Sequence, residues 1–277
     1  MLIDTHAHVN FVAYKGDGDE VVKRTLAEDV WLINVGAQED TSRRAVEYAQ
    51  RYPAGVFAAV GLHPIHLRAE HTEAHIDEYE TVEFSSRVEK FDYDEYKKLA
   101  QEPKVVAIGE VGLDYYRIKN NESGIMEKQK EVFKKQIELA IDLQLPLIIH
   151  CRNAHADILE ILNSYFMIHN SKIKGVIHSF SGRWSQAQEY LEMGFYLGFN
   201  GIITFARDYD RVVREMPLTR LLLETDCPYL TPIPFRGKRN EPSYVKYVAQ
   251  RVAELRNITF EEVAEVTTRN ARELFKI

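Results

Sequence analysis

The sequence contains very little cysteine and no long apolar run. Its 277 residues include only Cys151 and Cys227, with no CxxC pair. Two such thiols form no disulfide framework, so a reducing compartment, the cytoplasm, is the default expectation. No stretch approaches the roughly 18 consecutive apolar residues that a membrane span needs. Asp4 and His6 stand where a signal peptide would have its apolar stretch, so we expect neither export by that route nor membrane binding.

Positive charge is also scarce. The chain has 35 Lys and Arg against 42 Asp and Glu, a net charge of −7. This balance argues against a basic coat that wraps duplex nucleic acid, although it is compatible with a local basic patch inside a cleft. No Gly/Ser/Pro-rich linker or shift in composition divides the chain. We therefore expect a single domain over residues 1–277 and no obligate protein partner.

What the sequence does contain is a regular alternation of short apolar runs and longer helical patterns. Eight runs are strand candidates: Leu2–Thr5, Val30–Val35, Val56–Val60, Val105–Gly109, Leu147–His150, Gly175–His178, Phe195–Gly198 and Leu221–Thr225. Between and after them lie segments with apolar residues at helical spacing, among them Thr41–Arg51, Met126–Leu143, Ser185–Met193, Ser243–Arg256 and Phe260–Phe275. This order predicts an α/β fold, a closed (β/α)8 TIM barrel. The runner-up is an open doubly wound sheet, but no GxGxxG follows the first run.

The segment Ile65–Lys90 is longer than the usual connection in such a fold. It carries His66, His71 and His75 among many acids. We expect an elaborated loop or an extra helix near the barrel mouth, and we assign no role to its histidines. We expect these three histidines, and also His155 and His169, to lie on solvated loops or helix faces.

Potential metal ligands stand at the C-terminal ends of most strand candidates. They are His6, His8, His63, Glu110, His150, His178 and Asp226. In a barrel these ends converge on one face, where active sites lie, so the sequence predicts a metal site there. The two histidines of the HxH pair point to the same side of an extended strand, and the same alternation turns both cysteines away from the ligands.

Taken one at a time, these signals are weak. An isolated HxH pair binds metal in only about one case in three on spacing alone. A single histidine at a strand end, such as His63, is more often a hydrogen-bonded structural residue. Asp114 is best read as a structural carboxylate or one that supports a ligand. The shared placement of the residues at strand ends is what favours a metal site.

Several longer motifs extend this pattern over nearly the whole chain. They are DTHAH at 4–8, GLHP at 61–64, GEVGLDYY at 109–116, HCRNA at 150–154, HSFSG at 178–182, ETDCPYL at 224–230 and RGKRNEP at 236–242. With these motifs the chain resembles the TatD family of metal-dependent deoxyribonucleases, within the amidohydrolase-like barrel group. The resemblance implies two divalent metal ions. One ion would be held by His6, His8, Glu110 and Asp226, and the other by Glu110, His150 and His178.

The implied reaction is hydrolysis of phosphodiester bonds in DNA, single-stranded and from the 3′ end. Two cations can lower the pKa of a shared water and present hydroxide, with Asp226 orienting that water and taking its proton. Glu110 can bridge both ions. Histidines with carboxylates suit zinc, manganese or iron better than magnesium, with which the family's nucleases are often assayed, so the metal stays open.

Polar residues near the predicted mouth are candidate substrate contacts. They are His63, Arg152, Ser179, Arg236, Lys238 and Arg239. Arginine suits bidentate contact with phosphate, whereas lysine supplies a point charge. A charge run such as RGKRN is usually a solvated loop, but its place after the last strand favours phosphate binding here. Tyr115 and Tyr116 could stack on an unpaired base, or only pack under a loop.

Two other readings stay open. The same site could hydrolyse a small phosphate ester, an amide, a lactone or a phosphotriester, because fold and metals do not fix the substrate. Many barrels of the wider group use a carbamylated lysine on the fourth strand, where this chain has Glu110, which favours the nuclease branch. A non-catalytic binding module with a vestigial site is less favoured, because all six ligands are present.

Overall fold

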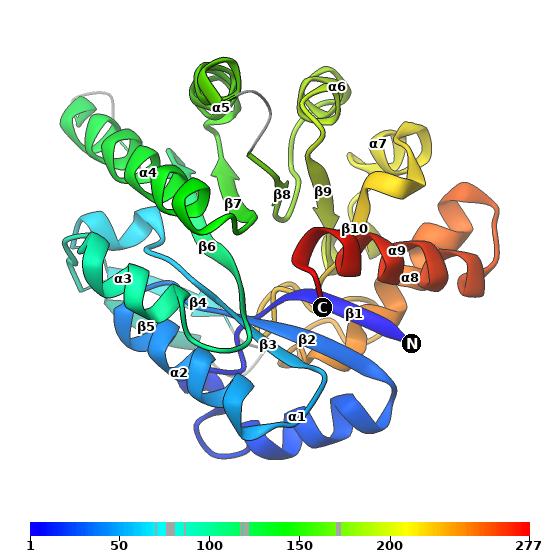
Figure 1. Ribbon diagram of the computed structural model, residues 1–277. Coiled ribbons are helices and arrows are strands. Elements are labelled where there is room, and N and C mark those ends of the chain that lie inside the picture. Colours follow the sequence, from blue (N-terminus) through cyan, green and yellow to red (C-terminus); the bar gives the residue numbers. More distant parts are fainter. Residues whose placement is uncertain (70, 76–80, 86, 117, 119–121, 170–172) are drawn as a thin grey trace.

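The chain forms a barrel of parallel strands surrounded by helices (Figure 1). The computed structural model describes residues 1–277 except 70, 76–80, 86, 117, 119–121 and 170–172. One sheet has the order β1 (Leu2–Ala7), β2 (Val30–Val35), β3 (Val56–Val60), β6 (Val105–Asp114), β7 (Leu147–Arg152), β8 (Gly175–Ile177), β9 (Tyr196–Phe199), β10 (Leu221–Leu223). Each strand candidate overlaps one of these strands, so the predicted (β/α)8 barrel is confirmed.

Helices follow most of the strands and pack on the outside of the barrel (Figure 1). They are α1 (Gly18–Ala27), α2 (Glu39–Arg51), α3 (Tyr93–Ala100), α4 (Ser123–Leu143), α5 (His155–His169), α6 (Trp184–Glu192), α7 (Asp210–Glu215), α8 (Val245–Arg256) and α9 (Phe260–Phe275). The strands are buried almost throughout, as expected for a parallel sheet covered on both faces. Among the helices described, none is long and apolar enough to cross a membrane.

The barrel closes where the first strand meets the last. Ala7 and Cys227 form a parallel bridge, and the backbone N–H of His8 donates to the Cys227 carbonyl at 2.9 Å. The N–H of Asp226 in turn donates to the His6 carbonyl, also at 2.9 Å. We call these contacts, with those of Asp4 below, the closing seam. They place the HxH pair beside Asp226, although the two lie at opposite ends of the sequence.

Asp4 ties the closing seam together from inside. Its carboxylate is fully buried and accepts hydrogen bonds from the Thr225 hydroxyl at 2.6 Å and the Thr225 N–H at 2.9 Å. It also accepts the N–H of His6 at 3.1 Å. One side chain therefore satisfies donors on both strands of the seam, one of them on a residue of the HxH pair.

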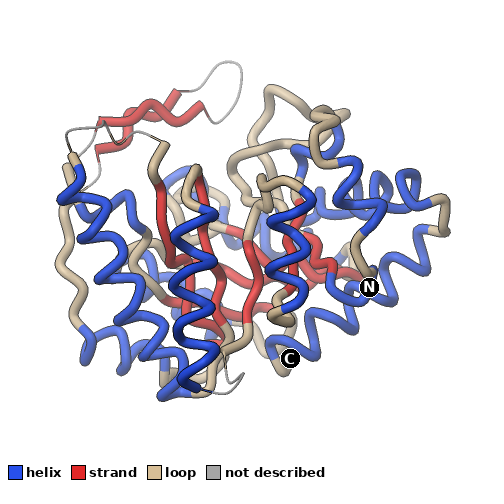
Figure 2. Tube along the Cα trace, turned by 90° about the horizontal axis from the view of Figure 1, so that it is seen from above, coloured by secondary structure: helices blue, strands red, loops and turns tan. Residues whose placement is uncertain are grey.

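The long connection after β3 forms a hairpin. A short 3-10 helix (Pro64–Leu67) is followed by β4 (His71–His75) and β5 (Thr81–Ser85), which pair antiparallel. The hairpin lies at the end of the barrel away from the C-terminus (Figure 2). Within its described residues the segment is therefore an elaborated loop, and the only helix there is the short 3-10 turn. The side chains of His71 and His75 lie outside the described residues.

Two histidines that were expected on solvated faces are buried instead. His66 is 3% exposed and follows His63 in the 3-10 helix. His155 is 9% exposed, and its Nδ1 lies 3.1 Å from the Tyr190 hydroxyl and 3.3 Å from the Cys151 sulfur. Tyr190 is distant from His155 in sequence, and Cys151 comes close to it only because the chain turns after β7. Residue type and spacing therefore do not predict the burial of His155.

We expect Asp4→Ala to lower the free energy of unfolding by about 3 kcal/mol, because it leaves buried donors unpaired at about 1–3 kcal/mol each. Urea unfolding measures the loss. The matched control is Asp92→Ala, since Asp92 accepts two backbone N–H groups at the exposed start of α3 and its loss should cost about 1 kcal/mol. Equal losses in the two variants would contradict the role given to Asp4.

Candidate metal centre

The HxH pair brings two imidazole nitrogens together at the end of β1. Nε2 of His6 lies 3.0 Å from Nε2 of His8, and both side chains are buried. Nδ1 of His8 lies 2.9 Å from the Val35 carbonyl, which can only accept, so Nδ1 carries the proton. The lone pair of His8 Nε2 is therefore free to bind a cation. The His8 ring also stacks on Phe11, with ring centroids 4.2 Å apart.

Two carboxylates complete this group of donors. Oδ1 of Asp226 lies 3.4 Å from Nε2 of His8 and 3.8 Å from Nε2 of His6. Oε2 of Glu110 lies 3.5 Å and 3.9 Å from the His6 and His8 nitrogens, respectively. Ligands bound about 2.0–2.2 Å from one ion are separated from each other by about 3.0–3.5 Å. The four side chains therefore fit a single divalent cation with only small shifts.

Glu110 reaches the centre through an irregularity in β6. The strand continues to Asp114, beyond the predicted end at Gly109, and its register with β7 shifts between Ile108 and Val111. Such a shift re-aims side chains relative to a regular strand. The Glu110 N–H donates to the Gly36 carbonyl of the neighbouring segment at 2.9 Å. The carboxylate thereby lies between the two halves of the site.

The other half of the site surrounds Oε1 of Glu110. Nδ1 of His150 lies 2.7 Å away, Nε2 of His63 3.4 Å and Nε2 of His178 3.9 Å. His150 is held from its other side by Asp114, whose Oδ2 lies 3.1 Å from Nε2. Asp114 thus contacts a predicted ligand on the edge of its ring turned away from Glu110. Each oxygen of Glu110 therefore faces a different group of imidazoles.

His63 differs from the other histidines in the atom that faces the site. Its Nδ1 accepts the N–H of Ile65 at 3.1 Å, so in the neutral ring Nε2 carries the proton. Burial lowers the pKa of His63, which keeps that ring neutral. A protonated Nε2 cannot bind a cation, but it can donate to an anion. The geometry therefore supports His63 as a contact to substrate and not as a ligand.

The histidines of the centre fall into two classes, one with a lowered pKa and one with a raised pKa. Burial and the nearby His178 lower the pKa of His6 to about 4. Burial also opposes protonation of His150 and His178. At His150 the carboxylates of Asp114 and Glu110 outweigh this effect. At His178 the carboxylates of Glu224, Asp226 and Glu110 do so. The pKa values rise to about 9 and about 10.

The carboxylates shift in the opposite direction. Burial works against ionisation of Glu110, yet His63, His150 and His6 hold its pKa well below the ordinary value. At Asp226 burial is likewise outweighed by His8, His178 and His6, so the pKa is lowered. The buried acids are therefore charged at neutral pH and need positive charge beside them. Protons on two histidines supply it without metal, and divalent cations fit the same place.

A pocket of about 680 Å³ opens onto this centre. Three of the predicted substrate contacts, His63, Arg152 and Ser179, line it. Arg236 and Lys238 are not among its lining residues. Arg236 instead lies over the Phe205 ring at 4.0 Å, and Lys238 is 6.0 Å from the Phe235 ring.

Arg239 has a structural role that argues against phosphate contact. Its guanidinium is paired with Asp17, with Nη1 2.9 Å from Oδ1, and donates to the Ala13 carbonyl at 2.8 Å. It also lies over the Tyr14 ring at 4.5 Å. The prediction that Arg239 contacts substrate is not supported, because its positive charge is already used by a carboxylate 222 residues away in sequence.

Sequence reasoning missed several residues at or near the pocket. Arg44, Arg68, Arg87 and Tyr229 line it. The three arginines lie outside the motifs quoted above, whereas Tyr229 lies within ETDCPYL but was given no role. Glu224 lies behind His178, with Oε1 3.0 Å from Nδ1. A signal for Glu224 did exist, because it precedes Asp226 by two positions, the same spacing that drew attention to the HxH pair.

The raised pKa values of His150 and His178 predict that cation binding releases about two protons at pH 7, because a bound imidazole must be neutral. Since both pKa values lie above 7 in the metal-free protein, apparent metal affinity should rise steadily from pH 6 to pH 9. Calorimetric titration of chelator-stripped protein in two buffers with different ionisation enthalpies counts the protons. Heats that do not depend on the buffer would contradict the prediction.

Comparison with known proteins gives a consistent family. The family model described as TatD related DNase matches residues 3–276. The chain is 44% identical to the uncharacterized metal-dependent hydrolase YabD of Bacillus subtilis (strain 168), over 100% of both chains. It is 34% identical to the uncharacterized metal-dependent hydrolase YcfH of Escherichia coli (strain K12), over 100% of this chain and 96% of that protein.

Solved structures agree in fold. The TatD homologue YJJV from Escherichia coli K12 has a TM-score of 0.83 at 28% identity, covering 100% of this chain and 98% of that one. The phosphotriesterase homology protein from Escherichia coli has a TM-score of 0.64 at 13% identity, covering 99% and 98%, a likeness in fold alone. The match to the family model over residues 3–276 and the 44% identity to YabD establish that the chain belongs to the TatD family of metal-dependent hydrolases.

Proposed function

We propose that the protein hydrolyses phosphodiester bonds of DNA, on single strands and from the 3′ end. The observation that carries the proposal is a candidate cation site, formed by His6, His8 and Asp226 with Glu110 beside them, that opens to the same pocket as the uncompensated positive charge of Arg152. A phosphodiester needs both features, because its charged oxygens must be held while further negative charge develops.

Arg152 is the pocket cation best suited to phosphate. Its guanidinium lies 3.7 Å over the Tyr116 ring, and within the described part of the chain no carboxylate pairs with it. Arg87, by contrast, is paired with Asp40, and Arg68 with Glu122. The planar guanidinium can donate two parallel hydrogen bonds to a phosphate, while the aromatic ring holds it in place.

The remaining groups have distinct parts in the reaction. Two bound divalent cations would lower the pKa of a water and neutralise charge on the phosphoryl group. Asp226, ionised and open to the pocket, accepts a hydrogen bond from the attacking water and takes its proton. His63 donates from Nε2 to an oxygen of the phosphate or of the leaving group.

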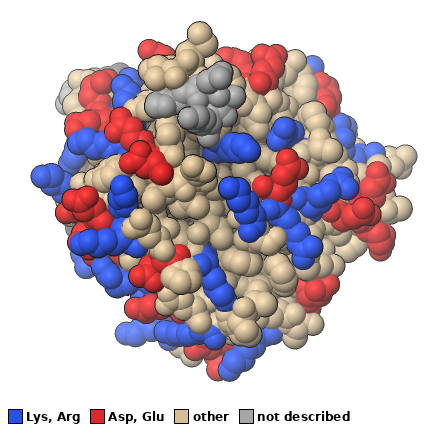
Figure 3. Space-filling model, viewed as in Figure 1, with Lys and Arg blue, Asp and Glu red and all other residues tan. Residues whose placement is uncertain are grey.

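Support for DNA as the substrate comes from the family description, TatD related DNase. The direction of attack rests on the resemblance described in the sequence analysis. Figure 3 shows the face that carries the chain termini, opposite the hairpin and the pocket, and there acidic and basic side chains are interspersed.

The first prediction of the proposal concerns Asp226. A single-stranded oligonucleotide labelled at its 5′ end is incubated with chelator-stripped protein resupplied with magnesium, manganese or zinc. We expect a metal-dependent ladder that shortens from the 3′ end, slowed at least about a hundredfold by Asp226→Asn. Intact DNA with every metal, despite measured metal uptake, would exclude DNA and favour a small phosphate ester, an amide or a lactone.

The second prediction concerns Arg152. We expect Arg152→Ala to raise the KM for the oligonucleotide about tenfold or more and to reduce the salt dependence of binding by about one phosphate contact. Metal affinity should not change, since Arg152 is no ligand. Arg239→Ala is the matched control: it should lower stability, because the pair with Asp17 is lost, and leave the KM unchanged. A larger effect on KM in the control would reverse the assignment.

A further inference from the structure

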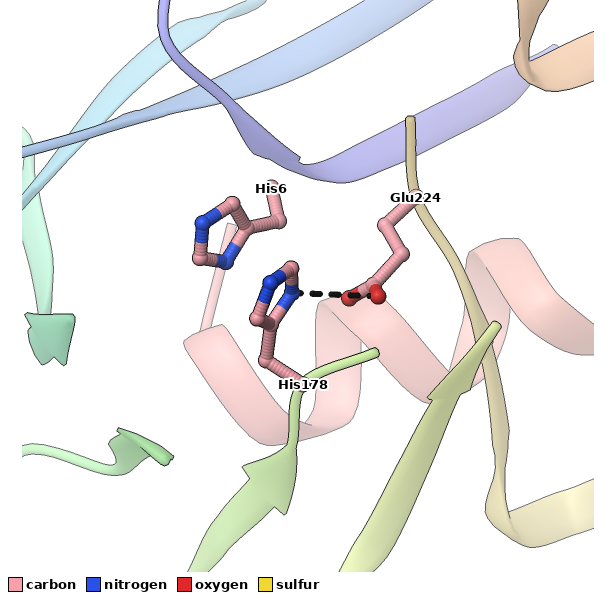
Figure 4. Close-up of side chains that lie close together, drawn as sticks. All are labelled: His6, His178 and Glu224. Carbon is pink, nitrogen blue, oxygen red and sulfur yellow. Dashed lines mark ion pairs between the residues drawn. The ribbon is translucent and has the colours of Figure 1, made fainter. Parts of the chain in front are cut away.

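Glu224 is a buried carboxylate that points toward the ring of His178 (Figure 4). It is fully buried and is not among the residues that line the pocket. Oε1 makes an ion-pair contact of 3.0 Å with Nδ1 of His178. Nε2 of the same ring faces the opposite way, 3.7 Å from Asp226 and 3.9 Å from Glu110. Glu224 therefore approaches the edge of the imidazole opposite the one that faces Asp226 and Glu110, and with His6 and His178 it forms a group close enough to hold an ion itself.

The same oxygen also holds the next residue of the chain. The N–H of Ser179 donates to Oε1 of Glu224 at 2.6 Å. Ser179 has a positive φ of 46°, a conformation that a residue other than glycine adopts only where its surroundings compensate the cost. The hydrogen bond to Glu224 supplies such compensation. The carboxylate thus fixes the backbone at the step from His178 to Ser179.

Asn200 sets the direction of the Ser179 hydroxyl. Oδ1 of Asn200 accepts the N–H of Ile202 at 3.1 Å, which fixes the amide so that Nδ2 donates to Ser179 Oγ at 2.8 Å. Because Oγ accepts from the amide, its own O–H is left to donate elsewhere. Ser179 lines the pocket, so this donor is available to an anion there.

The fold leaves room for this carboxylate at one glycine. A Cβ atom at Gly198 on β9 would lie 2.4 Å from Oε2 of Glu224 and 2.8 Å from its Cδ. Oε2 itself has no hydrogen-bond partner among the described residues. The space at Gly198 thus lets the carboxylate approach the ring of His178.

We propose that Glu224 is a positioning residue that directs the imidazole of His178 toward the metal site and holds the backbone of Ser179, whose hydroxyl Asn200 then leaves free to donate to a phosphate in the pocket. The first half depends only on the metal centre, whereas the second half rests on the proposed function. A carboxylate behind a ligating histidine orients the ring and raises its basicity, and loss of such a partner commonly weakens metal binding about tenfold to a hundredfold.

The metal half is tested by calorimetric titration of stripped protein with zinc or manganese. Glu224→Gln keeps the shape and an acceptor for the Ser179 N–H but removes the charge behind His178. We expect it to bind as many ions as the unmodified protein, one of them about tenfold to a hundredfold more weakly. His178→Ala is the benchmark for a lost ligand. Loss of one ion from Glu224→Gln, as in the benchmark, would make Glu224 a ligand and overturn the proposal, and unchanged affinity would overturn it too.

A second variant displaces the carboxylate without removing it. Gly198→Ala should force Glu224 away from His178 and weaken metal binding in the same direction as Glu224→Gln. Gly124→Ala on α4, where an added Cβ meets nothing within 4 Å, is the control and should leave the affinity unchanged. Metal binding by Gly198→Ala equal to that of the control would contradict the proposed contact. These titrations need no DNA, so they stand apart from any failure of the nuclease proposal.

The substrate half is tested with inorganic phosphate as the probe, on metal-saturated protein. We expect Ser179→Ala and Asn200→Ala to weaken phosphate binding about threefold to tenfold, the value of one hydrogen bond, with metal affinity unchanged. Glu224→Gln at saturating metal should bind phosphate within about twofold of the unmodified protein, because its amide oxygen still accepts the Ser179 N–H. Phosphate affinity unchanged in both Ser179→Ala and Asn200→Ala would overturn the substrate half.

Discussion

The whole site depends on the closing seam between β1 and the segment after β10. The N–H of Thr225 donates a hydrogen bond to Asp4, 221 positions away in sequence. Backbone hydrogen bonds also join His6 to Asp226 and His8 to Cys227. The HxH pair comes from one side of this seam and the Asp226 carboxylate from the other. A barrel must close for its strand ends to face a common centre. Closure is therefore the step that converts distant ligands into one site.

The need to balance buried charge explains why carboxylates and imidazoles lie next to each other in the site. Isolated carboxylates such as Glu110, Asp226 and Glu224 are costly to bury, so each lies within 4 Å of at least one imidazole. In the metal-free protein His150 and His178 hold protons that compensate this charge. Cations can replace those protons with little rearrangement of the side chains. The same network is thus a stabilising element without metal and a ligand set with it.

The sequence was sufficient for the barrel and for the gathering of the predicted ligands at its strand ends, because hydrophobic runs mark strands and strand ends converge by the geometry of the fold. It was insufficient where a contact joins residues with no local signal. The pairing of Arg239 with Asp17 spans 222 positions, and residue type alone suggested a phosphate contact. The positive φ values of Ser179 and Asp226 and the register shift that aims Glu110 likewise depend on tertiary contacts, which periodicity does not encode.

Metal binding and barrel stability should be linked through the same seam. A cation held by His6, His8, Glu110 and Asp226 would join β1, β6 and the segment after β10. A ligand that binds only the folded state stabilises it by about 2.7 kcal/mol at a hundred times its Kd. That gain is similar in size to the hydrogen bonds of Asp4. The two contributions act on the same closure, so changes at the seam alter metal affinity and stability together, whereas changes on the outer helices alter stability alone.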